Sequence, residues 1–405
     1  MKTNSVPKIR FKGFTDDWEQ RKLGDVFDER SERASGNEEL LSVTISNGVI
    51  RQIDSEKRNI ASEDKSNYKV VKKGDVPYNS MRMWQGAVGT SDYDGIVSPA
   101  YTVLIPKNNC NGKFFMELFK KQPTLEIFKR WSQGLTSDTW NLKYPVLSTI
   151  PFMVPSVKEQ EKIAEYFKSL DNLITLHQRK CEQTKELKKF MLQKMFPKKG
   201  EKNPEIRFPG FTDDWEERKL EEISDKVTEK NKNSEFVETL TNSAEFGIIN
   251  QRDFFDKNIS NEKNLNGYYI VREDDFVYNP RISNYAPVGP IKRNKLGRTG
   301  VMSPLYYVFR PYNIDKKFLE YYFDTTVWHK FMKINGDSGV RADRFAIKDS
   351  IFKTMPIPYP SIEEQRKIGK FFDNLNDIIA LHQRKCEQLK ELKKFMLQNM
   401  FPKKG

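Results

Sequence analysis

The sequence predicts an α+β protein with two mixed α/β domains and two long helices that form an antiparallel coiled coil, in a pseudo-two-fold tandem repeat. Three observations lead to this prediction. The 405-residue chain repeats itself, and the best-preserved part of the repeat is an unbroken stretch of helix-forming residues. Short apolar segments bounded by Gly, Pro and Asn lie between the preserved blocks and are typical of strands.

Two blocks define the repeat. Residues 9–19, Ile-Arg-Phe-x-Gly-Phe-Thr-Asp-Asp-Trp-Glu, return as residues 206–216. Residues 156–200 return as residues 361–405, and 31 of these 45 positions are identical. The sequence between the blocks diverges strongly. We therefore expect a first variable domain, a conserved helical segment, a second variable domain and a second helical segment, at residues 1–155, 156–197, 198–360 and 361–405.

Each conserved segment predicts one long helix. Val157–Met195 contains no Pro or Gly and is rich in Glu, Lys, Gln and Leu. A capping box precedes each helix and a proline follows it, at Ser156/Glu159 with Pro197 and at Ser361/Glu364 with Pro402. Residues spaced by four and three predict a heptad seam between the helices. The seam residues are Ile163, Phe167, Leu170, Ile174, His177 and Cys181, repeated as Ile368, Phe372, Leu375, Ile379, His382 and Cys386.

The divergent domains should contain short strands and one helix each. β-rich segments occur at 68–71, 101–105 and 306–309, and a proline-bounded strand precedes each long helix, at 150–155 and 355–360. Single helices are expected at 113–131 and 314–334.

Two polar loops in each domain are the candidate binding residues. One follows Tyr78-Asn79 or Tyr278-Asn279, and the other begins at Gly134 or Gly339. Arg, Asn, Gln and carboxylate side chains read base edges in a DNA major groove, so matched loops with exchanged side chains indicate two related readers. The candidates are Arg82, Trp84, Gln85, Thr136, Ser137, Asp138, Arg281, Ser283, Asn284, Arg341, Asp343 and Arg344.

Other residues allow more than one interpretation. His177/Cys181 and His382/Cys386 lie one turn apart and could have a metal or redox role, although we predict packing residues and no metal site. Trp18 and Trp215 could stack on bases, but core anchors are the preferred interpretation. The basic stretch at 185–189, repeated at 390–394, is either a solvated face or a phosphate contact.

Composition excludes several classes of protein. With three Cys and three His, neither a disulfide framework nor a Cys/His zinc site is expected. Apolar runs stay short of the roughly 18–20 residues of a membrane helix, and Met1–Asn4 does not begin a signal segment, so we expect a soluble cytoplasmic protein. The 69 Lys+Arg against 56 Asp+Glu, a formal charge of +13, favour a polyanionic partner.

The arrangement resembles the specificity (S) subunit of type I restriction–modification systems over essentially the whole chain. The junctions Pro155-Ser156-Val157-x-x-Gln160-x-x-Ile163 and Pro360-Ser361-Ile362-x-x-Gln365-x-x-Ile368 look like that family's domain-to-helix boundary. The repeated Ile-Arg-Phe-x-Gly-Phe-Thr-Asp-Asp-Trp segment belongs only to a subset of the family, and its role is open.

The resemblance implies a subunit without catalytic activity that binds double-stranded DNA. Each variable domain would be a target-recognition domain that reads one half of a bipartite DNA site, and the helices would fix the gap between the two halves. It also implies two methyltransferase (modification) subunits and further restriction/translocase subunits as partners. S-adenosylmethionine, ATP and Mg would then belong to those partners, with no cofactor in this chain.

Two functions of other classes remain as alternatives. One is a stand-alone metal-dependent nuclease that uses Asp214, Glu217 and Lys219, although the first repeat has Gln20 in place of the glutamate. The other is a coiled-coil scaffold that binds DNA without regard to sequence. The nuclease predicts cleavage by the purified chain, and the scaffold predicts only salt-sensitive binding.

Overall fold

The structure is a computed structural model that describes residues 6–35, 38–55, 64–198, 200–254, 262–337 and 343–402. It divides into two compact units. Unit 1 combines Met1–Gln178 with Gln383–Gly405, and unit 2 is Arg179–His382. Both unit boundaries cut through a long helix, so each helix begins in one unit and ends in the other. The four domain boundaries expected from the sequence are a different division and stay a prediction.

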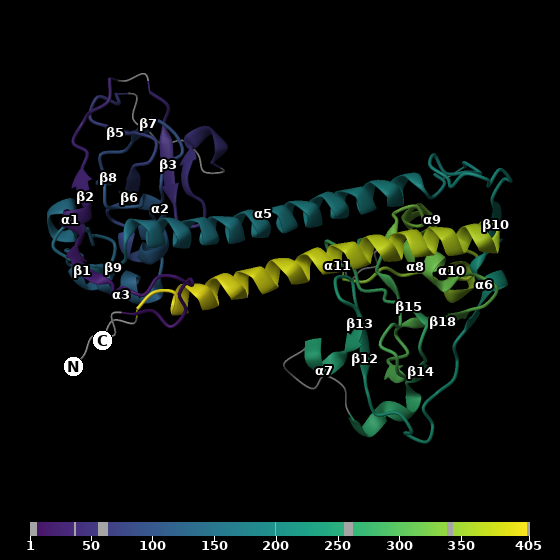
Figure 1. The fold of residues 1–405 in the computed structure, drawn as a ribbon. Helices are drawn as coiled ribbons and strands as arrows, with labels where there is room; N and C mark the ends of the chain where they lie inside the picture. The colour runs from purple at the N-terminus through teal and green to yellow at the C-terminus, as the bar shows by residue number, and fades with distance from the viewer. Residues whose placement is uncertain are drawn as a thin grey trace. The chain divides into compact units, whose positions relative to one another are not determined.

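Unit 1 is built from small antiparallel sheets and short helices (Figure 1). The strands pair as β1 (Glu19–Lys22) with β9 (Pro151–Val154), β2 (Phe27–Glu29) with β8 (Tyr101–Pro106) and β6 (Val76–Asn79), β3 (Leu41–Thr44) with β4 (Gly48–Arg51), and β5 (Lys69–Val71) with β7 (Gly95–Val97). The helices are α1 (Leu23–Val26), α2 (Gly112–Phe119), α3 (Gln122–Trp131) and α4 (Tyr144–Leu147), with 3₁₀ turns η1 (Gln52–Asp54) and η2 (Met83–Gln85).

Unit 2 repeats this plan. A four-stranded sheet has the order β11 (Ser224–Lys226), β18 (Tyr307–Pro311), β15 (Phe276–Tyr278) and β16 (Ile291–Arg293). Three further pairs are β10 (Glu216–Lys219) with β19 (Pro356–Tyr359), β12 (Leu240–Ser243) with β13 (Gly247–Asn250), and β14 (Tyr269–Val271) with β17 (Gly300–Met302). The helices are α6 (Leu220–Ile223), α7 (Gln251–Phe254), α8 (Lys316–Asp324), α9 (His329–Asn335) and α10 (Asp349–Phe352), with a 3₁₀ turn η3 (Glu262–Gly267). The predicted α+β class and its strands are confirmed.

The two long helices are also confirmed. They are α5 (Val157–Lys194) and α11 (Ile362–Asn399), each 38 residues long and continuous (Figure 1). In both units the start of one helix lies antiparallel to the end of the other. In unit 1, Lys393 Nζ pairs with Asp171 at 2.8 Å, and Phe401 stacks on Phe167 at 6.2 Å between ring centroids. In unit 2, Phe196 stacks on Phe372 at 6.3 Å.

The start of each helix is fixed by a buried glutamine, which explains the junction motif. Gln160 accepts the backbone N–H of Asn111 at 2.8 Å and donates to the Pro155 carbonyl at 2.9 Å. Gln365 makes the equivalent bonds at 2.8 Å each, to Asp315 and Pro360. The motif therefore joins the helix to the preceding strand and to the N-cap of α2 or α8.

The capping-box prediction is wrong for the glutamates. Both carboxylate oxygens of Glu159 accept from Arg10 at 2.7 Å, and those of Glu364 accept from Arg207 at 2.7 and 2.8 Å. The arginines come from the repeated Ile-Arg-Phe segment, so a charged hydrogen bond to a distant residue replaces the local one. This assigns the segment a structural role, because it holds the first turn of each long helix.

The tryptophan of the same segment is a core residue, as predicted. Trp18 and Trp215 are buried, and their rings meet Phe114 and Phe318 edge-on at 5.8 Å each. Burial excludes base stacking for both rings. Trp215 Nε1 also donates to Glu364 at 3.1 Å.

The C-terminal ends of the long helices are anchored in the cores of the units. Met195 and Phe196 join the core of unit 2, and Met400 and Phe401 join that of unit 1. The repeated segment closes over each end in the same way, since Ile206 N–H donates to Lys194 O and Ile9 N–H to Asn399 O, both at 2.9 Å. The ends of α5 and α11 are nearly identical in sequence, yet the first packs in the core of unit 2 and the second in the core of unit 1.

Two predicted single helices are each broken into two. The expected helix at 113–131 ends at Phe119 and restarts at Gln122, because Pro123 is tolerated only in a first helical turn. The expected helix at 314–334 ends at Asp324. There the Thr325 hydroxyl donates to the Tyr322 carbonyl at 2.6 Å and competes with the helical backbone.

Candidate nucleic-acid interface

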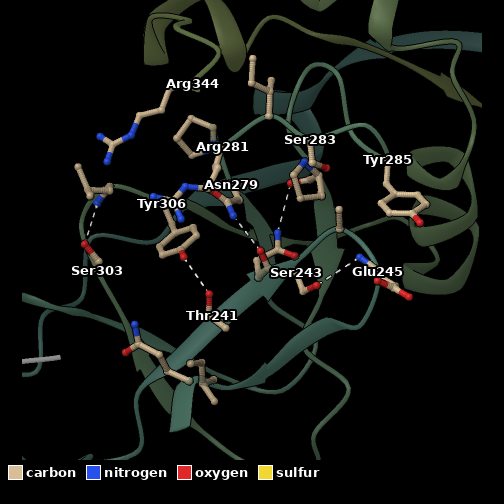
Figure 2. Close-up of a pocket in the computed structure, with 18 of the residues that line it drawn as sticks. Thr241, Ser243, Glu245, Asn279, Arg281, Ser283, Tyr285, Ser303, Tyr306 and Arg344 are labelled. Carbon is tan, nitrogen blue, oxygen red and sulfur yellow. Dashed lines mark hydrogen bonds between the residues drawn. The ribbon is translucent and has the colours of Figure 1, made fainter. Parts of the chain in front are cut away.

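Each unit carries a polar pocket at the same place in the repeat. The pocket of unit 1 has a volume of about 990 Å³ and lies beside the β3–β4 hairpin. The pocket of unit 2 has a volume of about 550 Å³ and lies beside the β12–β13 hairpin (Figure 2). In both, the loop after β6 or β15 and the turn before β8 or β18 complete the lining.

A shared frame builds the two pockets. Asn79 and Asn279 each accept, through Oδ1, the backbone N–H two residues ahead at 3.0 Å, which turns the loop sharply after the strand. The Ser-Pro-x-Tyr anchors form equivalent turns, with Tyr101 N–H donating to Ser98 O at 3.0 Å and Tyr306 N–H to Ser303 O at 3.1 Å. These anchors therefore belong to the scaffold.

Two buried tyrosines join the two loops that the sequence singled out separately. The Tyr78 hydroxyl donates to the Leu142 carbonyl at 2.9 Å, and the Tyr278 hydroxyl donates to Val288 O at 3.0 Å and contacts Phe345 O at 3.4 Å. Burial raises the pKa of both hydroxyls well above the usual range, so both remain donors. Each tyrosine therefore holds the end of the second loop against the first.

Backbone contacts complete this junction. In unit 1, Leu142 N–H donates to Ser80 O at 2.9 Å, and in unit 2, Phe345 N–H donates to Pro280 O at 2.7 Å. A β-bridge pairs Arg281 with Arg344. In unit 2, residues of both loops, Arg281 and Arg344, line the pocket, whereas in unit 1 the second loop packs against the first outside the lining.

The pocket of unit 1 contains two of the six predicted candidates in that unit. Arg82 and Gln85 line it, and their side chains approach to 3.5 Å. Trp84 lies beside Trp140, with 5.3 Å between ring centroids, and donates to the Met81 carbonyl. The remaining three, in the exposed loop after Gly134, lie outside the lining: Thr136, Ser137 and Asp138.

The pocket of unit 2 contains three of the predicted candidates. Arg281, Ser283 and Arg344 line it (Figure 2). Asn284 and Asp343 are exposed neighbours outside the lining, and Arg341 lies outside the described residues. Base reading by any of these residues stays a prediction.

The hairpin was missed by the sequence analysis although it supplies much of each lining. Ser46 and Asn47 line the first pocket, and Ser243 and Glu245 line the second. A signal was present. Four anchors recur at a separation of 199 residues: Leu41, Gly48, Ile50 and Gln52 match Leu240, Gly247, Ile249 and Gln251.

One hairpin residue shows how the frame is varied. Asn242 is buried, and its side-chain Nδ2 donates to the Val277 and Pro290 carbonyls at 2.7 and 3.2 Å. Its backbone carbonyl accepts from Asn279 Nδ2 at 2.8 Å. The matching residue of unit 1 is Val43, which packs in an apolar cluster. At this position the hairpin is held by hydrogen bonds in unit 2 and by apolar packing in unit 1, although Leu240 and Ile248 of the unit 2 hairpin also belong to an apolar cluster.

The predicted seam residues are placed as follows. Ile163, Phe167 and Leu170 belong to the core of unit 1, and Ile368, Phe372 and Leu375 to that of unit 2. Ile174, Cys181 and Cys386 are buried, whereas His177, Ile379 and His382 are half-buried. Their pairing across a coiled coil stays a prediction.

The nuclease cluster does not assemble. The Asp214 carboxylate accepts from Lys202 at 3.1 Å and from Asn203 at 2.6 Å, and Glu217 and Lys219 are exposed residues of the short strand β10. Across the described residues, no group of three His, Cys, Asp or Glu side chains could hold a metal ion. Nor does any described helix combine the length and apolar character needed to span a membrane.

A repeated scaffold with two equivalent but chemically different polar pockets defines a class of protein, a two-site recognition subunit. Residues 15–186 and 212–391 both match the type I restriction modification DNA specificity domain. The chain therefore belongs to the specificity subunits of type I restriction–modification systems, and the alternatives of a nuclease and a sequence-blind scaffold are not supported.

Individual relatives agree with this assignment. The chain is 25% identical to the MjaVIII specificity subunit of Methanocaldococcus jannaschii over 349 residues, which cover 80% of this chain and 77% of that one. It is 26% identical to the HindI specificity subunit of Haemophilus influenzae over 168 residues, 40% of this chain and 37% of that one. The fold is similar to that of the S subunit from M. genitalium, with a TM-score of 0.55 at 15% identity over 99% and 100% of the two chains.

Proposed function

We propose that each unit reads one half of a bipartite site on double-stranded DNA, and that the chain itself catalyses no reaction. The observation that supports this proposal is the pair of equivalent pockets. Their scaffold residues are shared, with Asn79/Asn279 and Tyr101/Tyr306 in matching places, while their exposed polar residues differ. A constant frame with exchanged hydrogen-bonding groups is what two different base sequences require.

The long helices set the spacing between the half-sites in this proposal. A helix of 38 residues is about 57 Å long at 1.5 Å per residue. Both helices are anchored at both ends, with the starts held by Glu159 and Glu364 and the ends by Phe196 and Phe401. Two connectors anchored in this way would hold the separation of the two readers constant, as a fixed gap between two half-sites requires.

A repeated apolar stripe supports docking of two methyltransferase subunits. Four large side chains of α5 are exposed, and the four matching side chains of α11 are exposed as well, all between 40% and 52%. They are Leu173, Leu176, Leu187 and Phe190, and Ile378, Leu381, Leu392 and Phe395. Their spacing of 3 and 14 residues places them on one face of each helix. Exposed apolar stripes of this kind accept a partner helix.

Catalysis then resides in the partners. S-adenosylmethionine would be bound by the methyltransferase subunits, and ATP and Mg by restriction/translocase subunits that join them, with the assembly in the cytoplasm. This chain would supply the DNA sequence preference and the docking surfaces.

The test is a methylation map. The chain is co-expressed with its methyltransferase subunit, and methylated adenines are located across a plasmid library by direct sequencing. We expect one motif of two short halves separated by a fixed gap. A single continuous motif, or methylation without a shared motif, would contradict the proposal.

A further inference from the structure

Unit 2 contains two arginines and one glutamate whose charged groups have no partner among the residues that the structure describes. The guanidinium groups of Arg281 and Arg344 make no hydrogen bond or ion pair with any described residue, and neither does the carboxylate of Glu245. All three are exposed and line the same pocket. In the rest of the unit, the arginines of the scaffold, such as Arg207 and Arg310, are bonded to carboxylates.

The two arginines are held next to each other. A β-bridge pairs their backbones, and the Phe345-to-Pro280 hydrogen bond of 2.7 Å fixes the two loops together. Figure 2 shows their side chains toward one side of the pocket and Glu245 toward the other. Neighbouring like charges repel each other, so this arrangement suits an external acceptor with several oxygen or nitrogen atoms.

The free carboxylate indicates which acceptor fits. A DNA phosphate would suit the arginines but would be repelled by Glu245. The major-groove edge of a G·C base pair suits both the arginines and the glutamate, because guanine presents the O6 and N7 acceptors and cytosine presents an N4 donor. Arginine binds the guanine edge with two hydrogen bonds, and glutamate accepts from cytosine N4.

The described lining of the pocket in unit 1 does not show this combination. Among its described residues one is an arginine, Arg82, beside Gln85. Its lining carboxylate, Asp54, is already bonded to Arg51 at 2.8 Å. The two pockets thus differ in the charges they offer on a similar frame.

We propose that unit 2 reads a G·C base pair, with one of the paired arginines, Arg281 or Arg344, donating to both guanine O6 and N7 and Glu245 accepting from cytosine N4. This inference rests on the proposed function and adds the identity of one base pair to it. That arginine and the glutamate are then residues that determine specificity.

The experiment uses lysine variants, because lysine keeps the positive charge but cannot form the two-pronged bond to guanine. Arg281→Lys, Arg344→Lys and Glu245→Gln are made in the full chain, which is co-expressed with the methyltransferase subunit. Arg82→Lys and Arg366→Lys are the matched controls, the first in the other pocket and the second on an exposed part of α11. The half-site of unit 2 is the one that does not change when residues 1–155 are exchanged for those of another family member.

We expect a G·C pair in the half-site of unit 2. At least one of the two lysine variants should lower the preference for guanine at one position by roughly tenfold or more, and Glu245→Gln should relax the preference at the same pair. Arg82→Lys should affect only the other half-site, and Arg366→Lys neither. Because the substituted side chains are exposed, thermal midpoints should stay at the wild-type value.

Three results would overturn the inference. The first is a half-site of unit 2 without a G·C pair. The second is an unchanged base preference in all three variants, and the third is a uniform loss across all sequences, which is the signature of phosphate contact. If wild-type protein shows no two-part motif, the proposed function fails as well, so the two failures are distinguishable.

Discussion

Glu159 and Glu364 occupy the same position in the two repeats but accept different numbers of hydrogen bonds. Both are buried and bind an arginine with both oxygens. Only Glu364 also accepts from tryptophan, since Trp18 Nε1 in unit 1 has no partner among the described residues. Glu364 therefore accepts one more side-chain hydrogen bond in unit 2 than Glu159 accepts in unit 1.

This difference predicts unequal costs of substitution. Removing one partner of a buried ion pair typically costs about 3–5 kcal/mol. Glu364→Ala should lower the free energy of unfolding by about 1.5–3 kcal/mol more than Glu159→Ala, because Trp215 also loses a charged acceptor. Urea unfolding of the two variants, followed by tryptophan fluorescence, measures this. Equal losses would show that the Trp215 bond contributes nothing.

His329 gives a second prediction at this scale, on pH. Burial, with a smaller contribution from Lys333, lowers the pKa of His329 to about 4 in the folded protein, against 6.5 ordinarily. The unfolded chain therefore takes up this proton below pH 6.5 while the folded chain does not. The stability contributed by the neutral ring is complete above pH 6.5 and is lost as the pH falls toward 4.

His329→Gln removes this proton linkage. We expect the urea midpoint of the variant to fall less steeply between pH 6.5 and 4 than that of the wild type. The ring of His329 also packs against that of Trp328, with 4.5 Å between the ring centroids. A loss of this packing would lower the urea midpoint at every pH, whereas a loss of proton linkage changes the slope of the midpoint against pH. Parallel slopes would contradict the assignment.

At the scale of elements, the long helices carry two kinds of phenylalanine. Phe196 and Phe401 are buried in the cores of the units, whereas Phe190 and Phe395 are exposed on the apolar stripe. We expect Phe196 and Phe401 to contribute to the stability of the fold and Phe190 and Phe395 to partner binding, although the two phenylalanines at each helix end are separated by fewer than two helical turns.

The prediction compares Phe196→Ala with Phe190→Ala. Loss of a buried phenylalanine costs about 3–5 kcal/mol, whereas an exposed one changes the free energy of unfolding by roughly 0.5 kcal/mol or less. Phe190→Ala should instead weaken the capture of the methyltransferase subunit on an affinity column. A normal yield of complex with Phe190→Ala and Phe395→Ala combined would contradict docking on the stripe.

Much of the element structure could be predicted from the sequence. Helix-forming residues without Pro or Gly specify α5 and α11 locally, and Pro-bounded apolar runs specify β9 and β19. Pro123 was an available sign of the break between α2 and α3, and the Leu-Gly-Ile-Gln anchors were an available sign of the hairpin.

Other features could not be predicted because they depend on distant contacts. Glu159 and Glu364 fit a capping box, but their partners, Arg10 and Arg207, lie about 150 residues away. The helix ends are nearly identical in sequence, so nothing local indicates that Phe196 joins one core and Phe401 the other. Only tertiary packing decides both outcomes.

At the scale of the whole molecule, the duplication separates a constant role from a variable one. The conserved segments form the helices, their anchors and the stripe, while the diverged segments form the two pockets. Under the proposed function, this division would allow one half of the DNA specificity to change while the docking surfaces for the partner subunits stay the same.

In the proposed function, the two pockets read DNA independently of each other. The most direct measurement exchanges residues 1–155 for the matching domain of another family member and maps methylated adenines again, with the same methyltransferase subunit. We predict that one half of the motif changes, and that the other half and the gap stay as they were. A change in both halves, or in neither, would contradict the account.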